Sequence, residues 1–139
     1  MHDVAVVVGR DLADEGVQAA GMQFATSGYV VQGQAIQLVG PQSTIRVGDG
    51  TLAGAAYMTG LYANLTGATQ LVKTDLGTLV LDGANSYSGG TAISGGTLQV
   101  AADANLGDAA GGLSLADGTT LRTTAAFTSG RDITLTSGT

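Results

Sequence analysis

The chain lacks cysteine and tryptophan, and it has a single proline and a single histidine among its 139 residues. Without cysteine, neither a disulfide nor a thiolate metal site can form. The one histidine is His2, at the start of the sequence, so the rest of the chain cannot supply the histidine of a Ser-His-Asp triad. We therefore expect no metal, no cofactor and no serine-hydrolase chemistry in this chain.

Basic residues are also scarce. Five lysines and arginines stand against eleven acidic residues, which gives a formal net charge of −6. This charge repels phosphate groups, and no basic cluster offsets it, so neither nucleic acid nor an anionic membrane surface is an expected partner. No run approaches the roughly 18 apolar residues of a membrane-spanning helix. No secretory leader follows Met1, so composition alone leaves open a cytosolic protein or a piece of an exported one.

Glycine is abundant, with 23 residues, and it separates short apolar runs that favour strands over helices. Residues 57–65 have helical spacing interrupted by glycine and threonine, and residues 11–20 could form a short helix with Asp11 as its N-cap. Elsewhere we expect strands, at residues 4–8, 22–24, 29–31, 36–39, 45–47, 70–73, 78–81, 91–93, 97–100, 112–115, 119–122 and 133–135.

Apolar pairs recur along the second half of the chain. They begin at residues 79, 98, 113 and 133, at separations of 19, 15 and 20 residues. A recurrence of about 20 residues is typical of β-solenoid coils, which stack at the ~4.8 Å spacing of hydrogen-bonded strands. A β-sandwich is the alternative, although it usually needs longer strands and more large aromatic residues. The pairs are Leu79/Leu81, Leu98/Val100, Leu113/Leu115 and Ile133/Leu135.

The most regular stretch, residues 70–107, reads QLVKTDLGTLVLDGANSYSGGTAISGGTLQVAADANLG and contains the tetrapeptide SGGT twice. This stretch resembles the passenger-associated transport repeat, also called the autotransporter-associated β-strand repeat, of Gram-negative autotransporters. Asp75 departs from the pattern, which has glycine at this turn, but aspartate can also fill a turn position. The matching residues are Leu71, Lys73, Gly77, Thr78, Leu79, Leu81, Gly83, Asn85, Tyr87, Gly89, Gly90, Thr91, Ile93, Gly95, Gly96, Thr97, Leu98, Val100, Leu106 and Gly107.

The resemblance implies that residues 1–139 form one segment of a right-handed parallel β-helix. In such a passenger the partners are the remaining coils and a C-terminal translocator barrel, which anchors the parent protein to the outer membrane. The repeat is associated with transport and folding of the passenger, not with catalysis. A solenoid segment also has strand edges at its two ends, so we expect it to associate end to end or to cover an end with its own N-terminal residues.

The glycine pairs are interpreted as turns that adopt positive φ where a side chain would clash with the neighbouring coil. Thr91 and Thr97 are expected to start strands whose inward residues are apolar. We further expect Asn85 to hydrogen-bond to the backbone at a corner, and Tyr87 to lie over the adjacent coil with its hydroxyl in water.

Motifs typical of catalytic or ligand-binding sites match this chain poorly. The stretch GDGTLAGAAY at 48–57 lacks the spacing and the basic residue of a phosphate-binding loop. A pair of catalytic carboxylates is conceivable in a solenoid, but the candidates stand beside small turn residues, and we interpret them as solvated corner residues. These candidates are Asp49, Asp82, Asp103, Asp108 and Asp117.

Two functional hypotheses follow. The first is a structural stem that supports secretion and folding of its passenger. The second is an adhesin-type surface for host or neighbouring cells, whose ligand the sequence does not identify. The second is indicated only by residues 53–67, AGAAYMTGLYANLTG, with Tyr57 and Tyr62. A polysaccharide-cleaving enzyme would need converging carboxylates, and the sequence shows none.

Overall fold

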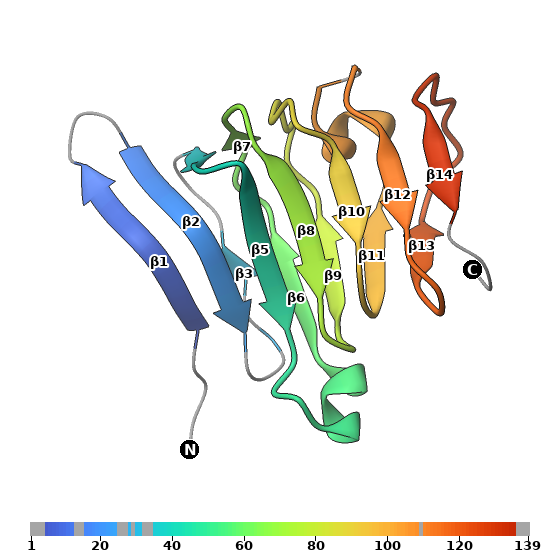
Figure 1. Cartoon of the computed structure of the whole chain (residues 1–139), viewed down its shortest axis with the longest axis horizontal. Coiled ribbons are helices and arrows are strands. Elements are labelled where there is room, and N and C mark those ends of the chain that lie inside the picture. Colours follow the sequence, from blue (N-terminus) through green and yellow to red (C-terminus); the bar gives the residue numbers. More distant parts are fainter. Residues whose placement is uncertain are drawn as a thin grey trace.

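The computed structural model describes residues 5–12, 16–24, 28, 30–31, 35–108 and 110–135, with side chains at 21–24, 28, 35–108 and 110–135. Within these ranges the chain forms two β-sheets that face each other (Figure 1). The first sheet contains β1 (Ala5–Leu12), β2 (Gly16–Phe24), β4 (Ile36–Leu38), β5 (Gln42–Val47), β7 (Leu65–Thr66), β8 (Gln70–Thr74), β10 (Thr91–Ile93), β12 (Leu113–Leu115) and β14 (Ile133–Leu135). The second contains β3 (Val30–Val31), β6 (Met58–Leu61), β9 (Thr78–Leu81), β11 (Thr97–Val100) and β13 (Thr120–Thr123).

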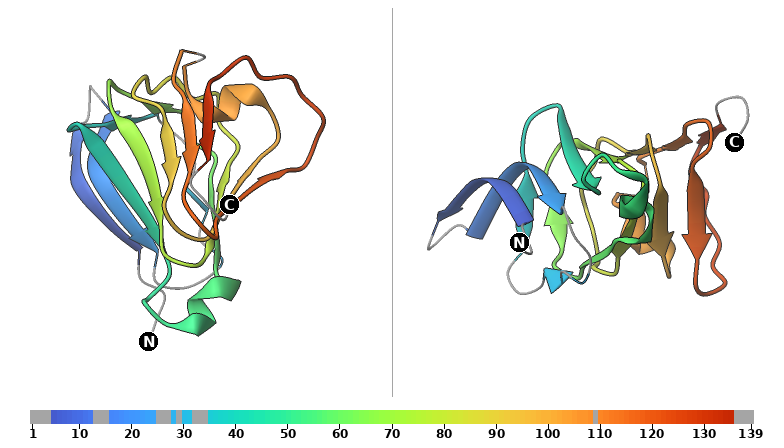
Figure 2. Two further views of the ribbon diagram at one scale, coloured as in Figure 1. Left: turned by 45° about the vertical axis from the view of Figure 1, so that its right-hand side comes forward. Right: turned by 90° about the horizontal axis from the view of Figure 1, so that it is seen from below.

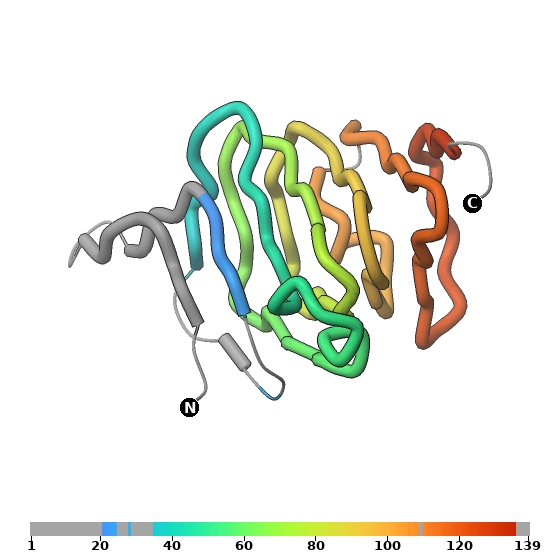
Figure 3. The backbone as a smooth tube through the Cα atoms, turned by 60° about the horizontal axis from the view of Figure 1, so that its bottom comes forward, coloured from blue at the N-terminus to red at the C-terminus, as the bar shows by residue number. Residues whose placement is uncertain are grey.

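The chain winds as a β-solenoid. From β8 to β14 successive strands alternate between the two sheets, and each pairs in parallel with its counterpart one coil away. Figure 3 shows the backbone completing coil after coil along one axis. Earlier coils contain a third short strand, β4 or β7, and two 3-10 helices, η1 (Leu52–Ala56) and η2 (Asp103–Leu106), lie in connections between strands. The β-solenoid predicted from the repeat is therefore confirmed, whereas its right-handed winding stays a prediction.

The core lies between the two sheets and consists of rows of inward side chains. In the first sheet one row runs through Ser43, Leu71, Thr91, Leu113 and Ile133, as the strand register requires. In the second sheet Thr59 of β6, opposite Leu79, is a buried polar exception, and the other buried inward positions of successive strands hold leucine or valine. These residues are Leu61, Leu79, Leu81, Leu98, Val100 and, half-buried, Leu121.

The structure corrects the sequence analysis at two segments. The short helix considered at residues 11–20 is wrong, since the described residues there belong to β1 and β2. At 57–65 the helical spacing is also misleading, because β6 and β7 occupy this segment. Threonine at the middle of β6 favours an extended backbone, glycine there disfavours a helix, and pairing with β9 then outweighs the local spacing.

The edge of the first sheet beyond β2 is covered by β1, which is the one antiparallel strand among the described pairings. An N-terminal segment that covers an end was one of the two alternatives expected for a solenoid segment. The opposite edge of this sheet is β14, whose outer side pairs with no described strand (Figure 1). The two edges of the sheet are therefore finished differently.

Candidate functional site

The residues of the repeat occupy two alternating environments. Strands β9 and β11 bury every second side chain, so that Leu79, Leu81, Leu98 and Val100 are at most 1% exposed. The intervening residues of both strands, which include Thr78 and Thr97, are half-buried on the outer face. Thr91 differs from expectation, because it is itself an inward residue of β10 and is 1% exposed.

The glycine pairs are sites of close backbone contact between coils. A Cβ at Gly89 would lie 2.4 Å from the carbonyl carbon of Thr69, and one at Gly95 would lie 2.9 Å from the oxygen of Asp75. Gly90 and Gly96, the second members of the pairs, have φ of +90° and +68°, which favours glycine. Two other glycines of the repeat are equally confined, since a Cβ at Gly77 or Gly83 would lie within 2.7 Å of backbone or side-chain atoms of the preceding coil.

Asp75 stands where the repeat pattern has glycine, and it adopts a left-handed conformation with φ of +66°. Its carboxylate accepts hydrogen bonds from the Arg46 side chain at 2.8 Å and from the backbone amides of Gly50 and Leu76 at 3.0 and 2.8 Å. Burial alone would raise the pKa of Asp75, but these hydrogen bonds outweigh burial and lower the pKa below its ordinary value. The departure from glycine therefore ties two successive coils together.

Lys73 occupies an inward position between Ile45 and Ile93 of the neighbouring strands. Its aliphatic stem lies in the core, and its ammonium group reaches the corner, where it donates to the carbonyl oxygens of Thr74, Asp75 and Gly95 at 2.8–3.1 Å. Burial lowers the pKa of Lys73 to about 8, although the charge of Asp75 acts in the opposite direction. Burial of this lysine was not predicted, because its position was identified only by its match to the repeat pattern.

Asparagines link coils at another corner. The side chain of Asn85 accepts from the amide of Leu65 at 2.8 Å and donates to the carbonyl of Asn105 at 2.7 Å. Asn105 in turn donates to the carbonyl of Gly83 at 2.9 Å, and Asn64 accepts from the amide of Ala84 at 3.0 Å. The expected backbone hydrogen bond of Asn85 is thus present, and it is one step in a series that crosses three coils.

Tyr87 corrects a second expectation. Its side chain is fully buried, and its hydroxyl lies 2.6 Å from the Thr91 hydroxyl, not in water. Burial raises the pKa of Tyr87 to about 12. Because Thr91 is an inward residue with a polar atom, it supplies the hydrogen-bond partner that lets a tyrosine replace an aliphatic residue in the core.

Arg131 is a structural residue that the sequence analysis did not identify. Its side chain is only 1% exposed, and it pairs with the Asp103 carboxylate at 2.8 Å. It also donates to the carbonyl oxygens of Asp103, Gly107, Asp108 and Gly111 at 2.7–2.9 Å. A hydrogen bond from Arg131 is the main reason why the pKa of Asp103 falls below its ordinary value. The guanidinium therefore closes the η2 turn from the next coil.

The five carboxylates considered for catalysis have separate roles or none. Asp49 binds Thr51 and Tyr57, Asp103 binds Arg131, and Asp108 caps the amide of Ala110. Asp82 and Asp117 are exposed. Among the described residues, no group of three or more histidine, cysteine and acidic side chains converges in a way that could hold a metal ion. No described helix is long and apolar enough to cross a bilayer.

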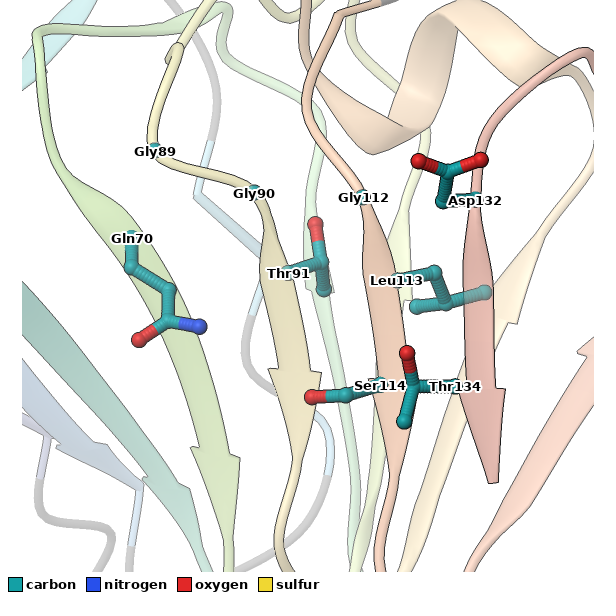
Figure 4. A pocket seen from close by; sticks show the side chains of 9 residues that line it. All are labelled: Gln70, Gly89, Gly90, Thr91, Gly112, Leu113, Ser114, Asp132 and Thr134. Carbon is teal, nitrogen blue, oxygen red and sulfur yellow. The ribbon is translucent and has the colours of Figure 1, made fainter.

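A shallow hollow of about 200 Å³ lies on the first sheet over β8, β10, β12 and β14 (Figure 4). Asp132 is the one ionisable residue that lines it, so the hollow lacks the second carboxylate that a glycosidase requires. The segment between β13 and β14 bows outward (Figure 2). Residues of this segment help to line a second hollow, which is apolar and has a volume of about 270 Å³. Among the described residues that line the two hollows, no nucleophile is oriented by a base. The second is lined by Leu106, Leu113, Leu121, Thr123, Ala125, Ala126, Phe127, Ser129 and Ile133.

Comparison with known proteins agrees with this arrangement. The family described as the passenger-associated transport repeat matches residues 71–100. The chain is similar to a protein described as the adhesin BmaC autotransporter of Brucella suis biovar 1 (strain 1330), with 59% identity over 120 residues. The match covers 86% of the chain but 4% of that adhesin, so the chain corresponds to a small part of its length. No solved structure matches the chain.

Proposed function

We propose that this chain, a β-solenoid segment of an autotransporter passenger, is a stem that supports secretion and folding of that passenger at the cell surface. In this proposal the parent protein is held in the outer membrane of a Gram-negative bacterium by a C-terminal translocator barrel. The partners of the segment are the coils before and after it. Its role is mechanical, and it needs no cofactor and performs no catalysis.

The observation that carries the proposal is the number of polar bonds that join one coil to the next. Asp75 reaches back to Arg46 and Gly50, Asn85 reaches to Leu65 and Asn105, and Arg131 reaches back to the turn at 103–111. Each folded coil therefore offers the next coil polar groups that are already in position for hydrogen bonds, together with apolar side chains on which its inward residues can pack. The stability of such a stack is the sum of the stabilities of its coils and of the contacts between neighbouring coils. Each coil that folds outside the membrane therefore adds stability and opposes backward movement of the chain.

The strand register defines a clean test in the parent protein. Thr97 lies opposite Thr78 in the second sheet, so removal of residues 78–96 excises one coil and joins Gly77 to a strand in the correct position. Removal of residues 78–90 instead joins Gly77 to Thr91, a first-sheet residue, and breaks the winding. Surface passenger is measured by antibody binding to intact cells, and barrel assembly by heat-modifiable migration.

We expect the one-coil deletion to lower surface passenger while the barrel assembles normally, and the 78–90 deletion to lower it further. Unchanged surface passenger after the one-coil deletion would contradict a role of this repeat in export. The adhesin alternative is favoured by the description of the relative. It predicts that surface passenger is retained after a change on the outer face of the segment while cell adhesion is lost.

A further inference from the structure

The connection from β5 of the first sheet to β6 of the second is longer than the later connections that run in the same direction. Three residues connect β8 to β9, and three connect β10 to β11, whereas residues 48–57 form a ten-residue connection between β5 and β6. This connection, the η1 loop, contains η1 and protrudes beyond the stacked strands (Figure 1). Insertions into solenoid coils often form the binding face, because they lie outside the repeated core.

The η1 loop is held in one conformation by its own polar groups. The carboxylate of Asp49 accepts from the amide and the hydroxyl of Thr51, and from the hydroxyl of Tyr57 at 3.0 Å. The hydrogen bond from the Thr51 hydroxyl is the main reason why the pKa of Asp49 lies below its ordinary value. Gly54 is buried within the loop, where a Cβ would lie 3.3 Å from Gly48. The loop is therefore a folded unit, and Tyr57, considered in the sequence analysis for contact with a ligand, serves its internal structure.

The loop is also fixed to the next coil. The amide of Gly50 donates to the Asp75 carboxylate, which is itself held by Arg46. Gly48, with φ of +144°, makes room for that carboxylate, since a Cβ there would lie 2.4 Å from the Asp75 side chain. The loop thus keeps a fixed direction relative to the solenoid.

This framework exposes apolar side chains. Leu52 is 86% exposed at the start of η1, and at the same corner Met58 and Leu76 are 42% and 40% exposed. Residues 51–58 contain no charged residue, and the nearest charges, Arg46, Asp49 and Asp75, are bound internally. An exposed leucine on a rigid loop, within the uncharged stretch 51–58, is suited to an apolar pocket, because little entropy is lost when a pre-formed loop binds.

We propose that the η1 loop is an adhesive contact that inserts Leu52 into an uncharged apolar pocket of a partner protein. The proposal rests on the adhesin alternative stated above. A protein is favoured over a lipid surface because the chain carries a net charge of −6 and the loop has no basic residue to meet anionic headgroups. Tyr62, the other aromatic residue considered in the sequence analysis, lies at the far end of β6, where its ring covers Gly60.

The test uses bacteria that display the parent protein and a monolayer of cultured epithelial cells, with adhesion divided by the amount of surface passenger. Leu52→Asp removes the apolar contact, and Leu52→Ser is a milder second variant. Asp49→Ala loosens the loop without removing an exposed apolar atom. Tyr62→Ser is the matched control, since Tyr62 is also an exposed apolar residue, at 45%, but lies outside the loop.

We expect Leu52→Asp to lower adhesion about tenfold, the effect of losing one buried leucine contact, with surface passenger unchanged. Asp49→Ala should lower adhesion severalfold, and Tyr62→Ser should leave it unchanged. Trypsin treatment of the monolayer should remove the difference between wild type and Leu52→Asp. Wild-type adhesion by both Leu52 variants would overturn the proposal.

Two other results would also overturn it. Equal loss of binding to protein-free phosphatidylcholine–phosphatidylserine vesicles would identify a lipid partner. Loss of self-association of the purified passenger, measured by sedimentation, in step with adhesion would identify a second copy. Failure of the proposed export function gives a different result, because it changes the amount of passenger at the surface and leaves the adhesion per passenger molecule unchanged.

Discussion

The middle coils and the last described coil follow the same path, but they bury their side chains to different extents. The inward residues of β9 and β11 are at most 1% exposed, whereas Ile133 and Leu135 of β14 are 54% and 62% exposed. The alternating apolar pattern is equally clear in both regions. Burial in a solenoid therefore comes from having a coil on each side, not from the sequence of one coil.

The two regions also differ in how coils are joined. In the middle coils the side-chain hydrogen bonds between coils are shared among Lys73, Asp75 and Asn85. The backbones of these coils also approach each other closely at glycine residues. In the last described coil one buried side chain, Arg131, makes several side-chain hydrogen bonds to the coil before it. We expect the middle coils to lose stability gradually under substitution, and the last coil to depend on this single residue.

The largest contrast should come from leucine removal. Leu98→Ala in β11 should lower the free energy of unfolding by about 2–5 kcal/mol, because it leaves a cavity in a packed row. Leu135→Ala in β14 should change it by less than about 0.5 kcal/mol, because the side chain is largely in water. Urea denaturation followed by circular dichroism measures both. Equal effects would mean that burial does not follow the number of neighbouring coils.

A smaller contrast is expected from two glycines. Gly89→Ala places a methyl group against the backbone of Thr69 and should cost about 1–3 kcal/mol. Gly130→Ala is the matched control in the last coil, where a Cβ would meet nothing within 4 Å. The midpoint of thermal unfolding distinguishes them. A tolerated alanine at 89 would show that the coils can separate to admit it.

Arg131→Met should act locally. It retains an apolar stem but leaves the carbonyl oxygens of the turn at 103–111 without their donor, at a cost of about 2 kcal/mol. Amide hydrogen exchange should quicken in β13 and β14, while β9 and β11 stay protected. Uniformly faster exchange in all four strands would contradict the local role.

Acid should produce the smallest effect. The Asp103 pKa is lowered in the folded protein, so the folded state binds its proton less readily than the unfolded state. The resulting stabilisation is present above the ordinary pKa of 3.8 and is lost as the pH falls through the lowered value. Because Asp103 is partly exposed, we expect a loss below about 1 kcal/mol. Asp103→Asn should remove this part of the pH dependence, which urea titrations between pH 2 and pH 6 would detect.

The sequence predicted the solenoid well where the pattern of the repeat depends on backbone geometry. In stacked coils, glycine pairs form the tight turns and alternating apolar residues form the inward face of a strand. Because of this, β8 to β14 were located within one or two residues. Residues whose partners lie a coil away were harder to interpret. Burial of Tyr87 depends on the hydroxyl of Thr91, and the role of Arg131 depends on carbonyl groups 20 or more residues distant in the sequence.

The η1 loop shows the same limit. Its residues were compared with a phosphate-binding loop, because nothing local reveals that Asp75, in the next coil, holds Gly50. Similarly, the helix formers at 16–20 gave no sign that pairing with β1 and β4 would draw them into a strand. Contacts with other strands and coils, which composition and periodicity do not encode, decide both cases.

The measurement that tests the central claim most directly is surface display of the parent passenger carrying Leu98→Ala or, separately, Leu52→Ala, which changes a leucine that is 86% exposed. If stacked middle coils support export, Leu98→Ala lowers the passenger on intact cells while the barrel assembles normally, and Leu52→Ala does not. Equal surface passenger for both variants and wild type, despite the lower stability of Leu98→Ala, would contradict a role of these coils in secretion.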